Sequence, residues 1–245
     1  MSHVTYLIDG ANWCHAAFHA DVDIEAMIRG FQKRARRPPN VFAALEGPGE
    51  TWRARLFPGF KAGREEKDEE LVEMLASLPG IFSRCGIRTV TAPSGYEADD
   101  VLATMAANAS GRVMILTADT DLIQVVSDNV FLGRRRGGEA LVTRPRDVAR
   151  RYGVWPSQWT DYLGLVGKPS NGLAGVPGIG AKGAASLIRE FGSLEEILKR
   201  PVRMKAEYRA KLKGHEDEAR LTQKLSTLKR DLAIPILIEK ISRRV

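Results

Sequence analysis

Short apolar segments that end at or near acidic residues alternate with helical segments along the first half of the chain. The expected strands are Val4–Ile8, Val41–Leu45, Ile87–Ala92 and Val113–Thr117. The expected helices between them are Trp13–Ala20 with Asn12 as its N-cap, Glu70–Phe82, and one that begins near Glu97. This alternation is typical of a mostly parallel sheet covered on both faces, so the sequence predicts an α/β fold.

Carboxylates gather where these strands end. They are Asp9, Glu46, Glu97, Asp99, Asp100, Asp119 and Asp121. The ends of parallel strands converge on one crevice, which is the usual ligand site of an open α/β sheet. One acid there is readily explained as a helix cap or turn residue, but seven would repel one another unless cations lie among them. Mg²⁺ or Mn²⁺ suits oxygen ligands, and such ions promote phosphodiester hydrolysis.

The trio around Asp99 divides by helical geometry. Glu97 and Asp100 share one helix face at i, i+3, whereas Asp99 points elsewhere once the helix is established. If Glu97 still belongs to the preceding loop, Glu97 and Asp99 can both reach the same ion.

A glycine-rich turn follows in a part of the chain that reads as helical from about Pro145 onward. Residues 175–184 read GVPGIGAKGA and lie between the expected helices Ser157–Val166 and Ala181–Phe191. Backbone N–H groups in such a turn can approach phosphate oxygens closely, which gives duplex binding without sequence preference. The DNA-binding residues expected here are Gly175, Val176, Gly178, Ile179, Gly180 and Lys182. Residues 233–238 are expected to be extended.

The charge balance favours an anionic partner. The 245 residues include 37 Lys and Arg against 30 Asp and Glu, which leaves a formal charge of +7. Basic clusters at 33–37, 134–136 and 203–213 are individually ordinary surface, but beside the glycine turn they extend a DNA track. Two cysteines and no long apolar stretch indicate a cytoplasmic protein without membrane contact, and no zinc-ligand spacing is present.

Five motifs, in order along the chain, resemble the 5′-nuclease family. This family comprises the 5′→3′ exonuclease domain of bacterial DNA polymerase I, related phage exonucleases and flap endonucleases. The motifs are LIDG at 7–10, FKAGR at 60–64, GYEADDV at 95–101, TADTD at 117–121 and the glycine turn at 175–184. The resemblance implies a Rossmann-like (PIN-type) sheet domain over residues 1–145. It also implies a helical DNA-binding region over 146–245, with a helix-hairpin-helix (helix-three-turn-helix) element at about 157–191 that binds duplex DNA around K⁺.

The resemblance also implies roles for individual residues. Asp9, Glu46, Glu97 and Asp99 would hold a first metal with Asp100 close by, and Asp119 and Asp121 would serve a second. Residues of about 61–83 would form an arch for a 5′ single strand. Lys61 and Arg64 at its base would polarise the scissile phosphate, and Phe60 would stack on a base.

Two departures from the family pattern bear on the metals. Glu46 stands where the family has Asp, a shorter side chain. The family's Gly-Asp-x-x-Asp reads here as GKPSN at 167–171, so Lys168 and Asn171 replace both carboxylates. Either the Lys168 ammonium, which is also expected to contact DNA, replaces part of the second metal's charge, or the activity is weak, because an ammonium cannot activate water as a metal does.

The favoured hypothesis is a monomeric, metal-dependent, structure-selective 5′-3′ exonuclease and 5′-flap endonuclease acting on DNA in replication and repair. Its expected partners are 5′ flaps, nicked or branched duplex and 5′ ends. One alternative is a branched-DNA-binding protein with weak or lost nuclease activity. A PIN-like ribonuclease is a further alternative, which the duplex-binding turn argues against.

Overall fold

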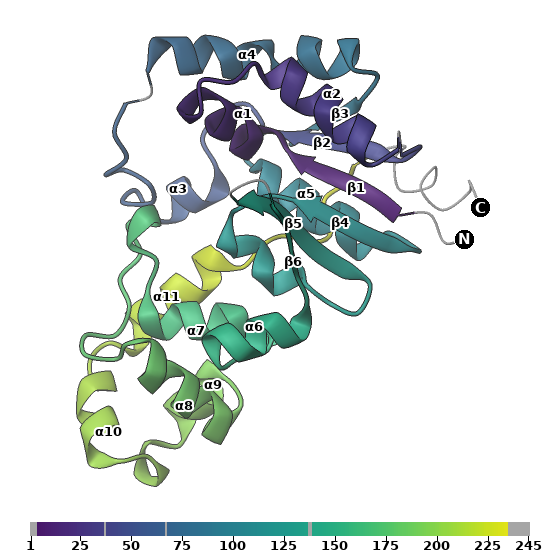
Figure 1. The fold of residues 1–245 in the computed structure, drawn as a ribbon. Coiled ribbons are helices and arrows are strands. Elements are labelled where there is room, and N and C mark those ends of the chain that lie inside the picture. Colours follow the sequence, from purple (N-terminus) through teal and green to yellow (C-terminus); the bar gives the residue numbers. More distant parts are fainter. Residues whose placement is uncertain (1–3, 37, 67, 137–138, 235–245) are drawn as a thin grey trace.

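A single six-stranded sheet organises the first part of the molecule (Figure 1). The computed structural model describes residues 4–36, 38–66, 68–136 and 139–234. The strands are β1 (Val4–Asp9), β2 (Val41–Leu45), β3 (Arg88–Thr91), β4 (Arg112–Leu116), β5 (Val130–Arg136) and β6 (Glu139–Thr143). They lie in the order β3-β2-β1-β4-β5-β6, and only β6 pairs in the antiparallel sense. The predicted mostly parallel α/β fold is confirmed.

Helices cover the two faces of the sheet. On one face lie α1 (Gly10–His19), α2 (Ile24–Arg34) and α4 (Glu69–Arg84), which pack with β1 and β2 around buried Ile8, Ala43 and Phe82. On the other lie α5 (Ala98–Ala107) and the 3-10 helix η1 (Thr120–Val125), packed around Val101 and Leu122. The short helix α3 (Trp52–Leu56) follows β2.

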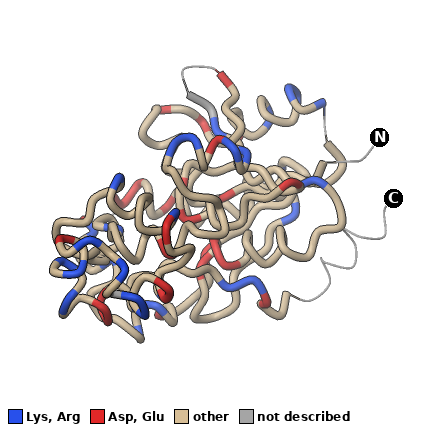
Figure 2. Tube along the Cα trace, turned by 90° about the horizontal axis from the view of Figure 1, so that it is seen from below, with Lys and Arg blue, Asp and Glu red and all other residues tan. Residues whose placement is uncertain are grey.

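The second half of the chain adds a helical region whose core is continuous with that of the second face. Its helices are α6 (Pro145–Tyr152), α7 (Trp159–Val166), α8 (Ala181–Phe191), α9 (Leu194–Lys199), α10 (Ala206–Leu212) and α11 (Glu216–Ser226), with 3-10 turns η2 (Pro156–Gln158), η3 (Pro169–Asn171) and η4 (Pro201–Arg203). None of the helices in the described ranges is long and apolar enough to cross a membrane. Lys and Arg residues are frequent along the chain in this region (Figure 2). Most of the expected extended segment at 233–238 lies outside the described residues.

The cap of α1 differs from the prediction. Asp9, rather than Asn12, is the N-cap, and its carboxylate accepts a hydrogen bond from the Asn12 N–H. Because β1 runs directly into α1, the last strand residue already has the extended backbone that an N-cap requires. Asn12 instead accepts a hydrogen bond from the Ala118 N–H at 3.0 Å, which ties α1 to the end of β4.

Helix α4 occupies most of residues 61–83, which were expected to form an arch, and the arch itself stays a prediction. From Glu69 onward the chain forms α4, whose apolar face, including Leu71, Leu78 and Phe82, is buried against the sheet. Asp68 caps this helix by accepting a hydrogen bond from the Glu70 N–H.

Helices α2 and α3 and the β5–β6 hairpin had no counterpart in the sequence analysis. Helix α2 contains Lys33 and Arg34 in its last turn, in a segment that was treated only as a basic cluster. The β5–β6 hairpin contains Arg134 to Arg136, whose charges hide the alternation typical of a strand.

The glycine turn joins α7 to α8 by tight backbone packing. The Val176 N–H donates to the Leu165 carbonyl at 2.8 Å, and the side chains of Val176 and Ile179 are buried. Those two residues, expected to bind DNA, therefore have no exposed side chain for it. Gly178, Gly180 and Lys182 are exposed, and the first N–H groups of α8 have no partner within the helix.

Two glycines of this turn differ sharply in the space around them. We expect Gly175→Ala to destabilise the protein by about 3 kcal/mol, because the new Cβ would lie 2.3 Å from the Val166 carbonyl carbon. Gly180→Ala is the matched control, because nothing lies within 4 Å of its Cβ and the backbone at Gly180 is extended. Urea unfolding of both variants checks this, and equal midpoints would contradict it.

Candidate active site

The parallel register brings Asp9 and Asp119 to one edge of the sheet. Asp9 ends β1, and Asp119 follows β4, the strand paired with β1. Asp9 is buried, and its two oxygens accept hydrogen bonds from the Asn12 N–H at 3.0 Å and the Thr117 hydroxyl at 2.7 Å. The Thr117 oxygen in turn accepts from the Asp119 N–H at 3.0 Å, so one hydroxyl fixes both acids.

Three carboxylates meet at this edge. Asp99, Asp119 and Asp121 each place one oxygen within 4.8 Å of the others. Asp99 comes from the first turn of α5, whereas Asp119 is the N-cap of η1 and accepts from the Asp121 N–H at 2.8 Å. Oδ1 of Asp121 is buried with no hydrogen-bond partner among the described residues.

Two acids at this edge of the sheet, Asp9 and Asp99, have raised pKa values. Burial raises the pKa of Asp9 to about 6, with Asp119 and Glu46 adding to the rise. Burial, followed by repulsion from Asp9, Asp119 and Asp121, raises the pKa of Asp99 well above its ordinary value. Folding therefore brings these carboxylates close together in a buried place, which makes their charged forms less stable. A bound cation would remove this cost.

Lys168 supplies a cation from the helical region. Its Nζ lies 3.1 Å from Oδ1 of Asp119 and 2.5 Å from Oδ2 of Asp121. Although burial alone would raise it, the pKa of Asp119 is lowered, chiefly by this ammonium. The pKa of Asp121 is nevertheless raised, because burial and the neighbouring Asp119 outweigh Lys168.

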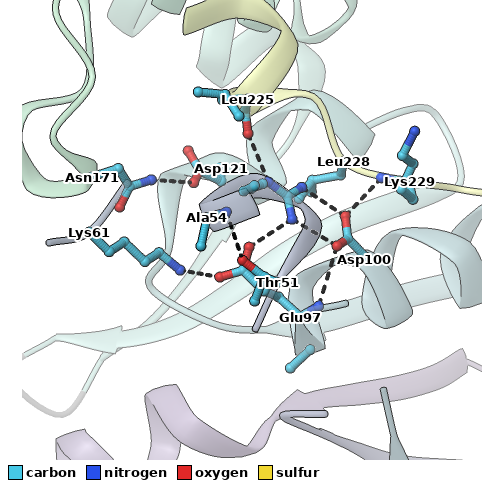
Figure 3. A network of polar contacts seen from close by, with 12 residues as sticks. Thr51, Ala54, Lys61, Glu97, Asp100, Asp121, Asn171, Leu225, Leu228 and Lys229 are labelled. Atoms are coloured by element: carbon cyan, nitrogen blue, oxygen red, sulfur yellow. Dashed lines mark hydrogen bonds and ion pairs between the residues drawn. The ribbon is translucent and has the colours of Figure 1, made fainter. Parts of the chain in front are cut away.

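Glu97 and Asp100 face a different partner, the buried guanidinium of Arg53 (Figure 3). Arg53 donates to Glu97 at 2.7 Å and to both oxygens of Asp100 at 2.8 Å, and Asp100 also accepts from the Lys229 N–H. Asp100 is fully enclosed and its carboxylate is bonded to Arg53, so it lies outside the group of acids that could share an ion, and its expected place close to a metal stays a prediction. Glu97 and Asp100 share a face as their spacing predicts, and Asp99 points away from it toward Asp119 and Asp121.

Lys61 connects the two groups of acids. Its ammonium forms an ion pair with Glu97, and its backbone N–H donates a hydrogen bond to the Asn171 carbonyl oxygen at 2.9 Å. Arg64 donates to the Asn171 side chain at 3.0 Å, and Asn171 also donates to Asp121 at 3.4 Å. The segment that follows α3 is thus held against η3. Its two basic side chains, Lys61 and Arg64, therefore lie near the carboxylates of the site.

Two further predicted site residues have structural partners. Phe60 is 7% exposed and packs with Leu173 and Leu225, so it is not available to stack on a base. Glu46 lies beside α5 and accepts from the Ala98 N–H at 3.1 Å, and its charge also contributes to the raised pKa values of Asp9 and Asp99.

A divalent cation fits the Asp99, Asp119 and Asp121 group. These residues offer hard oxygen donors within one ion's reach, and Oδ1 of Asp121 has no hydrogen-bond donor among the described residues. The raised pKa of Asp99 shows that the group gains from added positive charge.

Arg53 is the residue that the sequence analysis missed. It stands alone between Trp52 and Ala54, outside every basic cluster, and nothing in its local pattern distinguishes it from a surface arginine. A buried acidic pair such as Glu97 and Asp100 requires a cation, which is the only sequence-level signal that could have prompted a search for it.

Comparison with known proteins agrees with this arrangement. A family model described as the 5′-3′ exonuclease N-terminal resolvase-like domain matches residues 4–153, and one described as the 5′-3′ exonuclease C-terminal SAM fold matches residues 154–245. The chain belongs to the 5′-3′ exonuclease family. The resemblance inferred from the five motifs is confirmed.

Among curated relatives of this exonuclease chain are bacterial DNA polymerases. The thermostable DNA polymerase I of Thermus thermophilus is 40% identical over 200 residues, which cover 80% of the chain and 24% of the polymerase. That of Thermus aquaticus is 34% identical over 245 residues, covering 94% and 29%. The chain spans about a quarter of the length of these relatives.

Solved structures share the fold of this exonuclease chain. The T5 D15 protein co-crystallised with metal ions superposes with a TM-score of 0.77 at 22% identity, covering 91% of this chain and 89% of that one. The catalytic core of Rad2 in complex with DNA substrate gives a TM-score of 0.62 at 15% identity, covering 94% and 81%.

The raised pKa of Asp9 implies that the free energy of unfolding, measured in EDTA, depends on pH. Because the folded-state pKa of about 6 exceeds the ordinary value of 3.8, the Asp9 contribution to stability is full below pH 3.8 and lost as the pH rises through 6. Asp9→Asn should therefore match the parent near pH 4 and exceed its unfolding free energy by about 3 kcal/mol at pH 7.5. Urea unfolding across this range measures the difference, and a variant less stable than the parent at pH 7.5 would contradict it.

Proposed function

We propose that this chain is a metal-dependent, structure-selective 5′-3′ exonuclease and 5′-flap endonuclease that hydrolyses DNA phosphodiesters in replication and repair. One observation carries the proposal: Asp99, Asp119 and Asp121 converge at the carboxyl edge of the sheet, with Lys61 beside them. Family membership and the fold shared with the T5 and Rad2 proteins support it. We also propose that the protein is cytoplasmic, in keeping with only two cysteines in 245 residues, and that it is a monomer.

Mg²⁺ or Mn²⁺ is the proposed cofactor, held by Asp99, Asp119 and Asp121, with Asp9 and Glu46 supporting the same edge. When bound, such an ion lowers the pKa of water and offsets charge on the phosphate. The chain contributes the rest: Lys61 and Arg64 stand where an incoming phosphodiester would need positive charge. Glu97, held by Arg53, forms an ion pair with the ammonium of Lys61 and so fixes its position.

The helical region supplies duplex binding in this proposal. Gly178 and Gly180 leave the backbone exposed before α8, and Lys182 adds a cation on the same turn. Carbonyl oxygens of the turn are the proposed ligands for K⁺, which would bridge them to a DNA phosphate. Contacts of this kind position the duplex without reading its sequence.

Lys168 favours a second candidate function, a branched-DNA-binding protein with weak nuclease activity. Its ammonium already neutralises Asp119 and Asp121, where a second divalent ion would need free carboxylates. The first candidate is preferred, because Asp99 and the unpartnered Asp121 oxygen retain the capacity for one ion.

A labelled 5′-flap duplex incubated with Mg²⁺, Mn²⁺ or EDTA tests the proposal. We expect metal-dependent cleavage by the parent protein and at least a hundredfold loss in Asp99→Asn, on the order of what single electrostatic contacts contribute to catalysis. Flap binding by Asp99→Asn should be unchanged. Asp128→Asn, at an exposed loop position, is the control, and cleavage by Asp99→Asn at the control's rate would defeat the proposal.

Lys168 separates the two candidates. If its ammonium replaces part of a second metal's charge, Lys168→Ala should lower the cleavage rate by about tenfold, because the half-buried Asp119 and the buried Asp121 lose their counterion. The double variant Lys168→Asp, Asn171→Asp should instead show a steeper Mg²⁺ dependence and a rate at or above that of the parent. Mg²⁺ titrations of cleavage measure both, and a parent with no detectable cleavage beside an active double variant would favour the DNA-binding candidate.

A further inference from the structure

On one face of the sheet, no helix of the described residues lies over β4, β5 and β6. Helices α1, α2 and α4 pack with β1 and β2, and α1 and α2 border the same face of β4, β5 and β6 without covering it (Figure 1). A cavity of about 450 Å³ lies there. A parallel sheet normally has both faces covered, so this open part of the face is unusual for the fold.

The walls of this cavity are mainly apolar and partly aromatic. They include Tyr6, Trp13, Phe31, Leu116, Leu141 and Val142. We call this the aromatic cleft. Phe31 contacts the rings of both Tyr6 and Trp13 edge-on, at centroid separations of 5.3 and 5.6 Å. A concave apolar site of this volume is of the size that binds one small ligand.

Positive charge borders the aromatic cleft on two sides. Arg34 reaches it from the end of α2 and Arg134 from β5. Neither guanidinium has an ion pair or hydrogen bond with another residue of the described part of the chain. Two unpaired guanidinium groups beside apolar walls fit a ligand with a flat apolar part and an anionic part.

The aromatic cleft also adjoins the catalytic edge. Asn12, Thr117 and Ala118 line it, and the Ala118 N–H that binds Asn12 immediately precedes Asp119. The amide nitrogen of Asn12 has no acceptor within the described residues, so a donor faces the same space. The aromatic cleft therefore lies next to the edge of the sheet that carries the carboxylates.

We propose that the aromatic cleft binds one unpaired nucleotide of the substrate strand next to the scissile phosphate. This inference rests on the proposed nuclease function. The aromatic rings receive the base, and Arg34 and Arg134 receive its flanking phosphates. A base in a duplex is stacked and paired, so this site accepts a nucleotide only from a single-stranded segment. An acidic peptide has compatible chemistry, but the cleft opens onto the crevice where the DNA strand itself is present.

An abasic scan tests this on the parent protein. Flap substrates carry a single abasic residue at successive positions around the junction, and KM and kcat are measured for each. We expect one position, or two neighbouring ones, to raise KM by about tenfold, which corresponds to the loss of one stacked base. An equal KM at every position overturns the proposal and leaves the aromatic cleft to a protein partner.

A cleft-filling variant provides the second arm. Ala140 is exposed on β6 and lines the aromatic cleft, so Ala140→Trp should raise KM for the intact flap and remove the extra effect of the abasic residue. Ala76→Trp, at an exposed position of α4, is the matched control. The double variant Arg34→Gln, Arg134→Gln should also raise KM. Its control is Arg112→Gln, an exposed position at the amino-terminal end of β4. Equal KM for the Ala140 and Ala76 variants overturns the proposal.

Binding without cleavage separates this inference from the proposed function. A flap with 2-aminopurine at the sensitive position, or at the junction if nothing is cleaved, is titrated with protein in EDTA. Fluorescence quenching that Ala140→Trp abolishes and Ala76→Trp retains supports the aromatic cleft even in a chain without nuclease activity. Quenching that is absent in the parent, or identical in both variants, refutes it.

Discussion

A buried guanidinium holds together the edge of the sheet that carries the clustered acids. Arg53 is 2% exposed, and its donors reach Glu97, Asp100 and the carbonyls of Leu225 and Thr227. It thereby joins α3, the start of α5 and the chain that leaves α11. Removing one partner of a buried ion pair typically costs about 3 to 5 kcal/mol, because the remaining charge is left in a poorly solvated place. The orientation of Glu97, and with it the place of Lys61, follows from this contact.

The acids of the crevice fall into two groups with different counterions. Glu97 and Asp100 form buried ion pairs with Arg53, so they stabilise the fold as well as contributing to the site. Asp119 and Asp121 are neutralised in part by Lys168, which reaches them from the helical region. Asp99 has no such partner among the described residues, and its raised pKa reflects this. The unbalanced charge is thus concentrated at the position best placed to bind an ion.

The sequence was sufficient for the alternating strands and for the convergence of Asp99, Asp119 and Asp121, because both follow from local pattern and parallel topology. The sequence was insufficient where contacts between residues far apart in the chain decide whether a side chain is exposed. Asp100 and Phe60 carry the right chemistry for a site, yet each is enclosed by residues from beyond position 170. The helix α4 read correctly as a helix, but its burial against the sheet depends on tertiary packing that no local pattern encodes.

The partners of Arg53 are far apart along the chain, with 172 positions between Arg53 and Leu225. During synthesis the sheet, α3 and α5 leave the ribosome well before the carbonyls of Leu225 and Thr227 do. Domains generally fold from the N-terminal side as the chain emerges. A nascent chain therefore carries the Arg53 guanidinium with part of its hydrogen bonding missing until residues 225–229 arrive. The catalytic edge is among the last parts of the molecule to be completed, although most of its acids are translated early.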